Sequence, residues 1–453
     1  MNPAEAFIDH ALGLTWEAIP APARQAARTF LHDSLCVGVA GRNAPHADDI
    51  LRAAQGWGQG SDGGVLGRPG VRLPATQAAF VNAFQIHSQE FDCVHEPAVV
   101  HPLATILAAL MAETERSGPY AGREILTALT AGVDVAAGLG VAVTTPLKFF
   151  RPATAGIFGC VAAIARLRRL PREIALEAFG YALAFASGTM QAHTEGKPAL
   201  PVQIANAARG AIAAIDVACA GLTAARQSID GPFGYLPLFE TGFDLAPVIA
   251  SLGKTFRIAE VSWKPFPTGR AAHGAIVATQ ALIRDHGIAL EDVESLTYRA
   301  PPLIKRLVGR PMIEVMTPAH ARLCFPYLAG IVLTRGGVGL TDFTPESLNN
   351  PRLRAFAGRV TVEDNGNPDP AAFVPAVAIV RLKDGRELHA EVAAQFGSPA
   401  WPLSREQHMD KAQACLAFGG LPDIHGPLAA LIDDFENLDD GGAAFRLAAG
   451  SNA

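Results

Sequence analysis

The chain has 453 residues, of which 49% are hydrophobic and 18% are charged. This composition is too apolar and too weakly charged for a disordered chain, and the length allows two or three domains with a large core. The formal charge of −6 lacks the basic excess with which proteins bind nucleic acid, so we expect small-molecule partners and no nucleic acid.

The amino-terminal segment and the most apolar stretches also bear on location. Residues 1–5 show neither the basic nor the apolar region of a secretory signal. The apolar stretch 131–143 is interrupted by Asp134 and falls short of the ~18 residues that a membrane span requires. We therefore expect no membrane span and a cytoplasmic location.

Helical periodicity dominates the first half of the chain. Apolar residues recur at spacings of three and four in 22–40 and again from Leu103 to Leu110, where they predict one amphipathic helix each. Further alanine-rich helices are predicted, in chain order, at about 122–142, 153–168, 172–190 and 203–222.

After about residue 252 the pattern changes to alternating apolar and polar residues. This alternation predicts strands at 293–299, 359–363, 376–382 and 386–392, the last two joined by an Asp384-Gly385 hairpin turn. Helices are predicted between them at 269–284, 319–335 and 345–357. From Ser404, which forms a capping box with Gln407, the helical pattern returns.

These changes predict a mainly α fold with an inserted domain. The large helical domain is formed by both chain ends, 1–256 and 398–453, and a smaller α+β lid domain occupies 257–397. No metal site is predicted: His95 and His101 are six residues apart, which places them on different sides of a helix, and Pro97 would interrupt that helix.

Six basic residues stand directly before a proline, and four of them lie close to the start of a predicted helix: His101, Arg151, Lys197 and Lys264. The first two precede predicted helices directly, and the other two lie a few residues upstream of one. Helix amino termini attract anions through their free N–H groups and their dipole, so cations placed there favour an anionic ligand. Any single member could instead be a solvated surface residue.

Several segments together resemble the MmgE/PrpD family, which includes 2-methylcitrate dehydratases, cis-aconitate decarboxylases and iminodisuccinate epimerases. The resemblance covers nearly the whole chain. The similar segments are Asn82, His87 and Glu90-Phe91-Asp92-Cys93-Val94-His95 up to His101-Pro102; Arg151-Pro152-Ala153-Thr154-Ala155-Gly156; Gly196-Lys197-Pro198 with Asn206-Ala207-Ala208; and Lys264-Pro265-Phe266-Pro267 with His273.

The resemblance implies a helical domain built from both chain ends, an inserted lid, a homodimer and an active site between the domains. It also implies that neither a metal nor an organic cofactor is used. Two departures concern the substrate: Asp92-Cys93-Val94 stands where the family usually has Asp-Asp-Thr, and Arg151 replaces a histidine of the decarboxylases. An additional guanidinium suits a substrate with several carboxylates, because arginine binds them through two parallel hydrogen bonds.

The chemistry shared by the family makes or protonates a carbon next to a carboxylate, which requires a base and fixed positive charge. We assign His101 as the leading proton-transfer residue and Asp92 as the residue that orients it or a neighbour, while Lys264 and Lys197 hold carboxylates or share the proton transfer. The expected substrate contacts are Arg151, Arg270, His273, Tyr327 and His95. Tyr327 has a second interpretation, as a buried aromatic residue of a core helix.

Three functions remain open. The first is a lyase that dehydrates a hydroxylated di- or tricarboxylate, which we favour over decarboxylation of cis-aconitate because of the departures above. The second is an epimerase of an aminodicarboxylate such as iminodisuccinate. The third is a non-catalytic helical scaffold that binds carboxylates.

Overall fold

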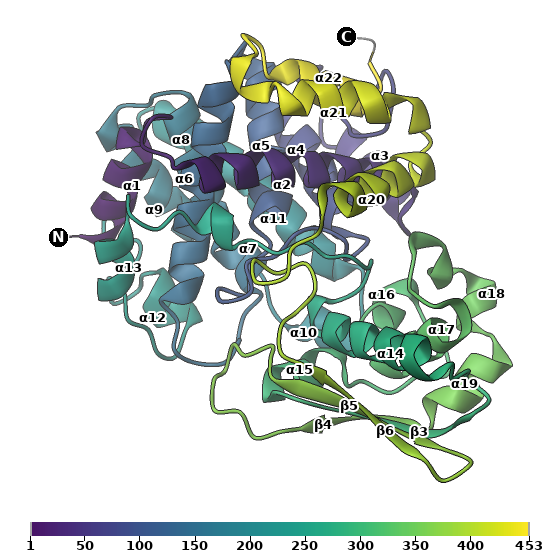
Figure 1. The fold of residues 1–453 in the computed structure, drawn as a ribbon. Coiled ribbons are helices and arrows are strands. Elements are labelled where there is room, and N and C mark those ends of the chain that lie inside the picture. Colours follow the sequence, from purple (N-terminus) through teal and green to yellow (C-terminus); the bar gives the residue numbers. More distant parts are fainter. Residues whose placement is uncertain (1, 452–453) are drawn as a thin grey trace.

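The amino-terminal half forms helices, as its apolar periodicity predicts, in a computed structural model that describes residues 2–451 (Figure 1). These helices are α1 (Pro3–Gly13), α2 (Ala21–Ala40), α3 (Ala47–Gln55), α4 (Ala75–His87), α5 (Pro102–Ser117), α6 (Gly122–Val141), α7 (Arg151–Thr154), α8 (Gly156–Leu167), α9 (Arg172–Phe185), α10 (Gln191–Glu195), α11 (Ala199–Cys219), α12 (Tyr235–Phe239) and α13 (Ala246–Ser251). A short antiparallel pair, β1 (Gly63–Gly64) and β2 (Arg72–Leu73), lies between α3 and α4.

The carboxy-terminal helices pack onto this part. They are α20 (Arg405–Phe418), α21 (His425–Asp433) and α22 (Gly442–Ala449), and α20 packs against α2. Ser404 and Gln407 form the predicted capping box at the start of α20. One hydrophobic core therefore includes residues from Ala4 to Val261 and again from Ala412 to Ala448.

Two helices of this core, α6 and α11, are long and apolar enough to cross a membrane by length and composition. Within the fold, 89% of the apolar window of α6 and 50% of that of α11 are buried. Asp134 in the middle of α6 accepts hydrogen bonds from the Arg257 backbone N–H and the His10 ring. The packed core thus accounts for the apolar character of α6, and the absence of a membrane span stays a prediction.

The intervening segment forms the α+β part, drawn in green at the lower right of Figure 1. Its elements are α14 (His273–His286), β3 (Val293–Ala300), α15 (Pro302–Val308), α16 (Pro318–Ala321), α17 (Phe325–Arg335), α18 (Pro345–Leu348), α19 (Pro351–Ala357), β4 (Val360–Asp364), β5 (Ala376–Leu382) and β6 (Glu387–Val392). The sheet order is β4-β3-β5-β6, with β3 and β4 parallel and the other pairs antiparallel. The mainly α fold with a small α+β part is therefore confirmed.

Short 3₁₀ helices complete the chain. They are η1 (Gly41–Asn43), η2 (Arg257–Glu260), η3 (Arg270–Ala272), η4 (Leu340–Phe343), η5 (Pro422–Ile424) and η6 (Phe435–Asn437).

Two of the helices predicted in the α+β part are interrupted. The helix predicted at 319–335 is divided into α16 and α17, because Pro326 lies in the first turn of α17 and cannot continue a preceding helix. The helix predicted at 345–357 is divided into α18 and α19 for the same reason. There Pro351 begins α19, and the Asn350 side chain accepts hydrogen bonds from its first N–H groups.

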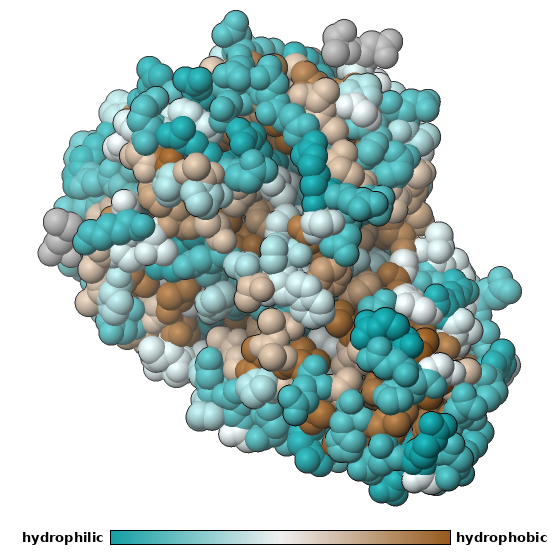
Figure 2. Space-filling model, in the orientation of Figure 1, coloured by the Kyte–Doolittle hydropathy of each residue, from teal (hydrophilic) through white to brown (hydrophobic). Residues whose placement is uncertain are grey.

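The chain passes from one part to the other and back along paired segments. The Trp263 N–H donates to the Gly397 carbonyl at 2.8 Å, which ties the outgoing segment to the returning one. Gly397 has φ +92°, and a Cβ there would lie 2.7 Å from the Trp263 carbonyl oxygen, so the close approach requires glycine. The second hydrophobic core begins just beyond, at Phe266, and ends at Val392. Figure 2 shows the narrowing between the two lobes. The domain limits at 256/257 and 397/398 stay a prediction.

Candidate active site

Two histidines share one buried carboxylate at the junction of the two lobes. Asp92 Oδ2 lies 3.0 Å from His87 Nδ1 and 2.9 Å from His101 Nδ1. A carboxylate accepts hydrogen bonds from both rings only if both Nδ1 atoms carry hydrogen. Each ring then presents its Nε2 away from Asp92, and the two rings lie edge to face with centroids 4.8 Å apart.

The local fold brings these residues together over a short stretch of chain. His87 is the last residue of α4, and His101 directly precedes Pro102, the first residue of α5. Between them, Glu90 adopts φ +50°, a left-handed conformation that is rare for glutamate and concentrated at functional sites.

Lys264 enters the same cluster from the segment that leads to the α+β part. Its side chain is fully buried, and Nζ donates to Glu90 Oε2 at 2.8 Å and lies 3.5 Å from Asp92 Oδ1. A buried ammonium requires such compensation, because an unpaired charge is strongly disfavoured away from water.

The cations keep both carboxylates ionised. Burial alone would raise the pKa of Asp92, but the opposing charges of His101, His87 and Lys264 hold this pKa well below its ordinary value. Glu90 behaves in the same way: Lys264, His87 and His101 outweigh burial and lower its pKa to about 2.

The pKa values of the two histidines shift in opposite directions. Burial disfavours the charged ring in both. In His87 the Asp92 carboxylate, its hydrogen bond and Glu90 outweigh burial and raise the pKa, whereas in His101 burial and Lys264 prevail and lower it. At pH 6.5, the ordinary pKa of histidine, the pair therefore favours a protonated His87 beside a neutral His101. Neighbouring groups whose pKa values are separated in this way can act as acid and base.

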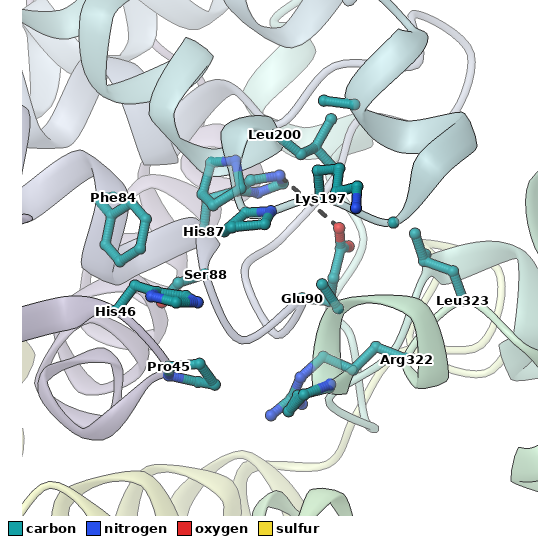
Figure 3. A pocket seen from close by; sticks show the side chains of 16 residues that line it. Pro45, His46, Phe84, His87, Ser88, Glu90, Lys197, Leu200, Arg322 and Leu323 are labelled. Carbon is teal, nitrogen blue, oxygen red and sulfur yellow. Dashed lines mark ion pairs between the residues drawn. The ribbon is translucent and has the colours of Figure 1, made fainter. Parts of the chain in front are cut away.

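Two adjoining cavities open onto the cluster, and both are lined by His87, Glu90, Leu200 and Leu323. Lys197 lies on the wall of the first, which Figure 3 shows between the helical part and Arg322 of the α+β part. His101 and His193 line the second. The exposed Lys197 side chain has no hydrogen-bond or ion-pair partner among residues 2–451.

His87, Asp92 and His101 also place three atoms of metal-ligand type within 4.8 Å of one another, although the sequence spacing predicted no metal. The Nδ1 atoms and the Asp92 oxygen between them are already joined by hydrogen bonds. This arrangement orients two imidazoles and suits proton transfer.

The structure places Arg151 outside the cluster. Its Nε and Nη2 donate to the two carboxylate oxygens of Glu240 at 2.9 and 3.3 Å, and Nη1 donates to the Ala98 carbonyl at 2.9 Å. Arg151 and Glu240 are both buried. The guanidinium is thus neutralised within the protein and lies apart from the cluster, and its role as a substrate contact stays a prediction.

Arg151→Ala should act on stability, because it leaves the buried Glu240 without a counter-charge. Breaking a buried pair costs about 3–5 kcal/mol, and replacing both partners by apolar groups costs much less. We expect this loss in denaturant unfolding of Arg151→Ala and a large recovery in Arg151→Met/Glu240→Leu. A single variant as stable as the wild type would contradict the structural role.

Three other expected substrate contacts are held by protein partners. His95 accepts from the Ala98 N–H through Nδ1, so its Nε2–H donates to Glu260 at 2.8 Å. Arg270 borders the second cavity, but Glu96 lies 2.7 Å from its Nη2. His273 Nδ1 lies 3.2 Å from Arg270 Nη1, and burial, Arg270 and Lys264 hold its pKa well below the ordinary value.

Tyr327 belongs to the core of the α+β part. Its hydroxyl donates to the Asp342 carbonyl at 2.5 Å and lies 2.9 Å from Ser347 Oγ. Both contacts lie within that part, and the side chain is fully buried. The geometry therefore matches the second interpretation, a buried aromatic residue, and the substrate contact stays a prediction.

Sequence reasoning assigned no role to Glu90, His87 or Arg322. Glu90 and His87 stand in the segment that contains Asp92, so the local concentration of ionisable groups was the available signal. Arg322 had none. Its Nη1 donates to the carbonyls of Gln89 and Pro267, which fixes the segments next to Glu90 and Lys264.

Comparisons with known proteins cover both parts of the chain. Residues 5–248 match the MmgE/PrpD N-terminal domain, and residues 266–421 match the MmgE/PrpD C-terminal domain. The chain is 30% identical to cis-aconitate decarboxylase of Homo sapiens over 393 residues, which are 83% of this chain and 80% of that protein. It is 28% identical to cis-aconitate decarboxylase of Mus musculus, over 94% of this chain and 89% of that protein. The cis-aconitate decarboxylase-like protein oryM of Aspergillus oryzae is 25% identical over 84% of this chain and 83% of its own length.

Proposed function

The chain belongs to the MmgE/PrpD family, and from this premise we propose that it is a lyase that acts on a polycarboxylate by moving a proton at a carbon next to a carboxylate. The observation that carries the proposal is the pair of histidines on Asp92, one favouring the protonated and one the neutral form. No cofactor is invoked in this chemistry.

The favoured reaction is dehydration of a hydroxylated di- or tricarboxylate. His101 Nε2 takes the proton from the carbon, and the electron pair enters the adjacent carboxylate as an enediolate. The pair then forms the double bond as hydroxide leaves from the neighbouring carbon. His87 protonates this hydroxide, so water departs. Lys264 offers fixed positive charge beside the two carboxylates of the cluster.

Decarboxylation is the second candidate, because the curated relatives named above are cis-aconitate decarboxylases. Loss of CO₂ leaves a carbanion that needs an acid, a role for which His87 is suited. Epimerisation needs an acid and a base on opposite faces of one carbon. Both rings are held by the same Asp92 oxygen, which suits opposite faces less well.

A screen of di- and tricarboxylates in heavy water, followed by NMR, separates these reactions. Dehydration gives new alkene signals without CO₂, and decarboxylation gives CO₂ with deuterium in the product. Epimerisation gives deuterium uptake with unchanged connectivity. Thermal stabilisation without exchange or turnover would identify a carboxylate-binding scaffold and refute the lyase.

The pH dependence of the activity follows from the shifted pKa values of the two histidines. His101 must be neutral and His87 protonated, and their pKa values lie below and above the ordinary 6.5 respectively. We expect kcat/KM to rise with pH through the pKa of His101, to pass through a maximum that includes pH 6.5, and to fall through the pKa of His87. His87→Gln should lose the alkaline limb, and retention of that limb would remove His87 as the acid.

A further inference from the structure

The proton-transfer cluster has little charge left for a polyanionic substrate. Glu90 and Asp92 are opposed by Lys264 and protonated His87, so two negative charges face two positive ones. A polycarboxylate must therefore find other cations on the cavity walls. Lys197 is one of them.

Arg310, in the loop between α15 and α16, is a further cation next to the second cavity, although it is not itself among the residues that line either cavity. Its Nη2 donates to the His193 carbonyl at 2.9 Å, and its Nη1 is buried without any hydrogen-bond partner among residues 2–451. No carboxylate among the described residues lies within 4.0 Å of it, in contrast to the buried Arg151 and Arg270. Burial accordingly lowers the pKa of Arg310, with only partial compensation from Cys324 and Glu90.

His193 connects Arg310 to the cavity that contains His101. It lines this cavity together with Leu307 and Val308, which lie just before Arg310 in the chain. Burial and Arg310 lower the pKa of His193 to about 4, so its ring is neutral. Because Arg310 Nη2 faces His193 Nδ1 at 3.4 Å, Nδ1 is the acceptor and Nε2 carries the remaining hydrogen.

We propose that Arg310 and the Nε2–H of His193 form a subsite for a substrate carboxylate remote from the reacting carbon, and that this subsite selects tricarboxylates over dicarboxylates. The inference rests on the proposed function and deepens it. An incoming carboxylate would supply both the counter-charge and the acceptor that Arg310 Nη1 lacks. Charge-assisted hydrogen bonds of this kind are stronger than hydrogen bonds between neutral groups.

A purely structural role for Arg310 makes a different prediction. Its bond to the His193 carbonyl joins α10 to the α+β part, so its loss could disturb both cavities and weaken all ligands alike. A subsite instead acts on one carboxylate only. Selectivity between two probes distinguishes these roles.

The test is calorimetric titration with tricarballylate, an unreactive tricarboxylate, and with glutarate, a dicarboxylate. We expect Arg310→Gln to weaken tricarballylate binding by about 10- to 100-fold and glutarate binding by less than about 2-fold. Arg310→Lys keeps the charge but loses the several N–H donors of the planar guanidinium. Its affinity for tricarballylate should lie between those of the wild type and Arg310→Gln. Arg306→Gln, at an exposed arginine on α15, is the matched control and should keep wild-type selectivity.

The outcomes separate the two proposals. Equal weakening of both probes in Arg310→Gln, or unchanged selectivity, overturns the subsite while leaving the lyase standing. Wild-type protein that binds neither probe refutes the polycarboxylate function itself. Arg310→Lys provides the same comparison of probes should Arg310→Gln fail to fold.

Discussion

Lys264→Met should reduce turnover by about 10²–10³-fold, the loss typical of removing one preorganised electrostatic group. It should also lower the free energy of unfolding by about 3–5 kcal/mol, because Glu90 and Asp92 would then share a buried site without their ammonium. The sequence alone predicted that Lys264 holds a carboxylate or shares the proton transfer, which concerns substrate and not folding. Full burial of Lys264 adds the loss of stability. Steady-state kinetics and denaturant unfolding measure the two effects separately.

Two further variants sharpen this prediction. Lys264→Met/Glu90→Gln removes one of the stranded negative charges, so it should regain much of the stability without regaining activity. Lys254→Met, at an exposed lysine, should match the wild type in both measurements. Full activity in Lys264→Met would remove the lysine from the chemistry.

The difference in stability between the wild type and Lys264→Met should also depend on pH. The native pKa of Glu90 is lowered from 4.5 to about 2, so its ion pair stabilises the fold fully above about pH 4.5. This contribution is lost as the pH falls through about 2. The gap between wild type and Lys264→Met should therefore be widest above pH 4.5 and should narrow in acid.

Local patterns predicted most of the fold. The spacing of apolar residues located α5 and α6 within a few residues, and the Asp384-Gly385 turn correctly joined β5 to β6. The errors arose where proline ends one helix and begins another, as at Pro326 and Pro351. Apolar periodicity continues across such a break, so it does not reveal the interruption.

The candidate site was predictable only in its local part. Asp92 and His101 lie nine residues apart and hydrogen bond as expected. The partners of Lys264 and Arg151, by contrast, lie 174 and 89 residues away in the chain. A basic residue before a proline looks the same in sequence whether its counter-charge comes from the protein or from a ligand. Distant carboxylates therefore decide which cations remain free for substrate.

His101→Gln should slow deuterium exchange at the substrate carbon next to the carboxylate by about 10²–10⁴-fold, the usual contribution of a general base. The glutamine amide can still donate to Asp92, so the fold and the affinity for substrate should be retained. The base is lost because the amide nitrogen has no lone pair that accepts a proton near neutral pH. NMR in heavy water measures the exchange. Thermal unfolding tests whether the fold is retained, and titration measures the affinity for substrate.

Two histidine variants make the assignment specific. His87→Gln should slow the departure of water while leaving exchange at the carbon, because His101 Nε2 can still remove the proton. His95→Gln changes a buried histidine that also faces a carboxylate, Glu260, but borders neither cavity. Its folded fraction should exchange at the wild-type rate. If His101→Gln also exchanged at that rate, the role of the base would pass to Lys197 or Lys264, to which the sequence already assigns a share in the proton transfer.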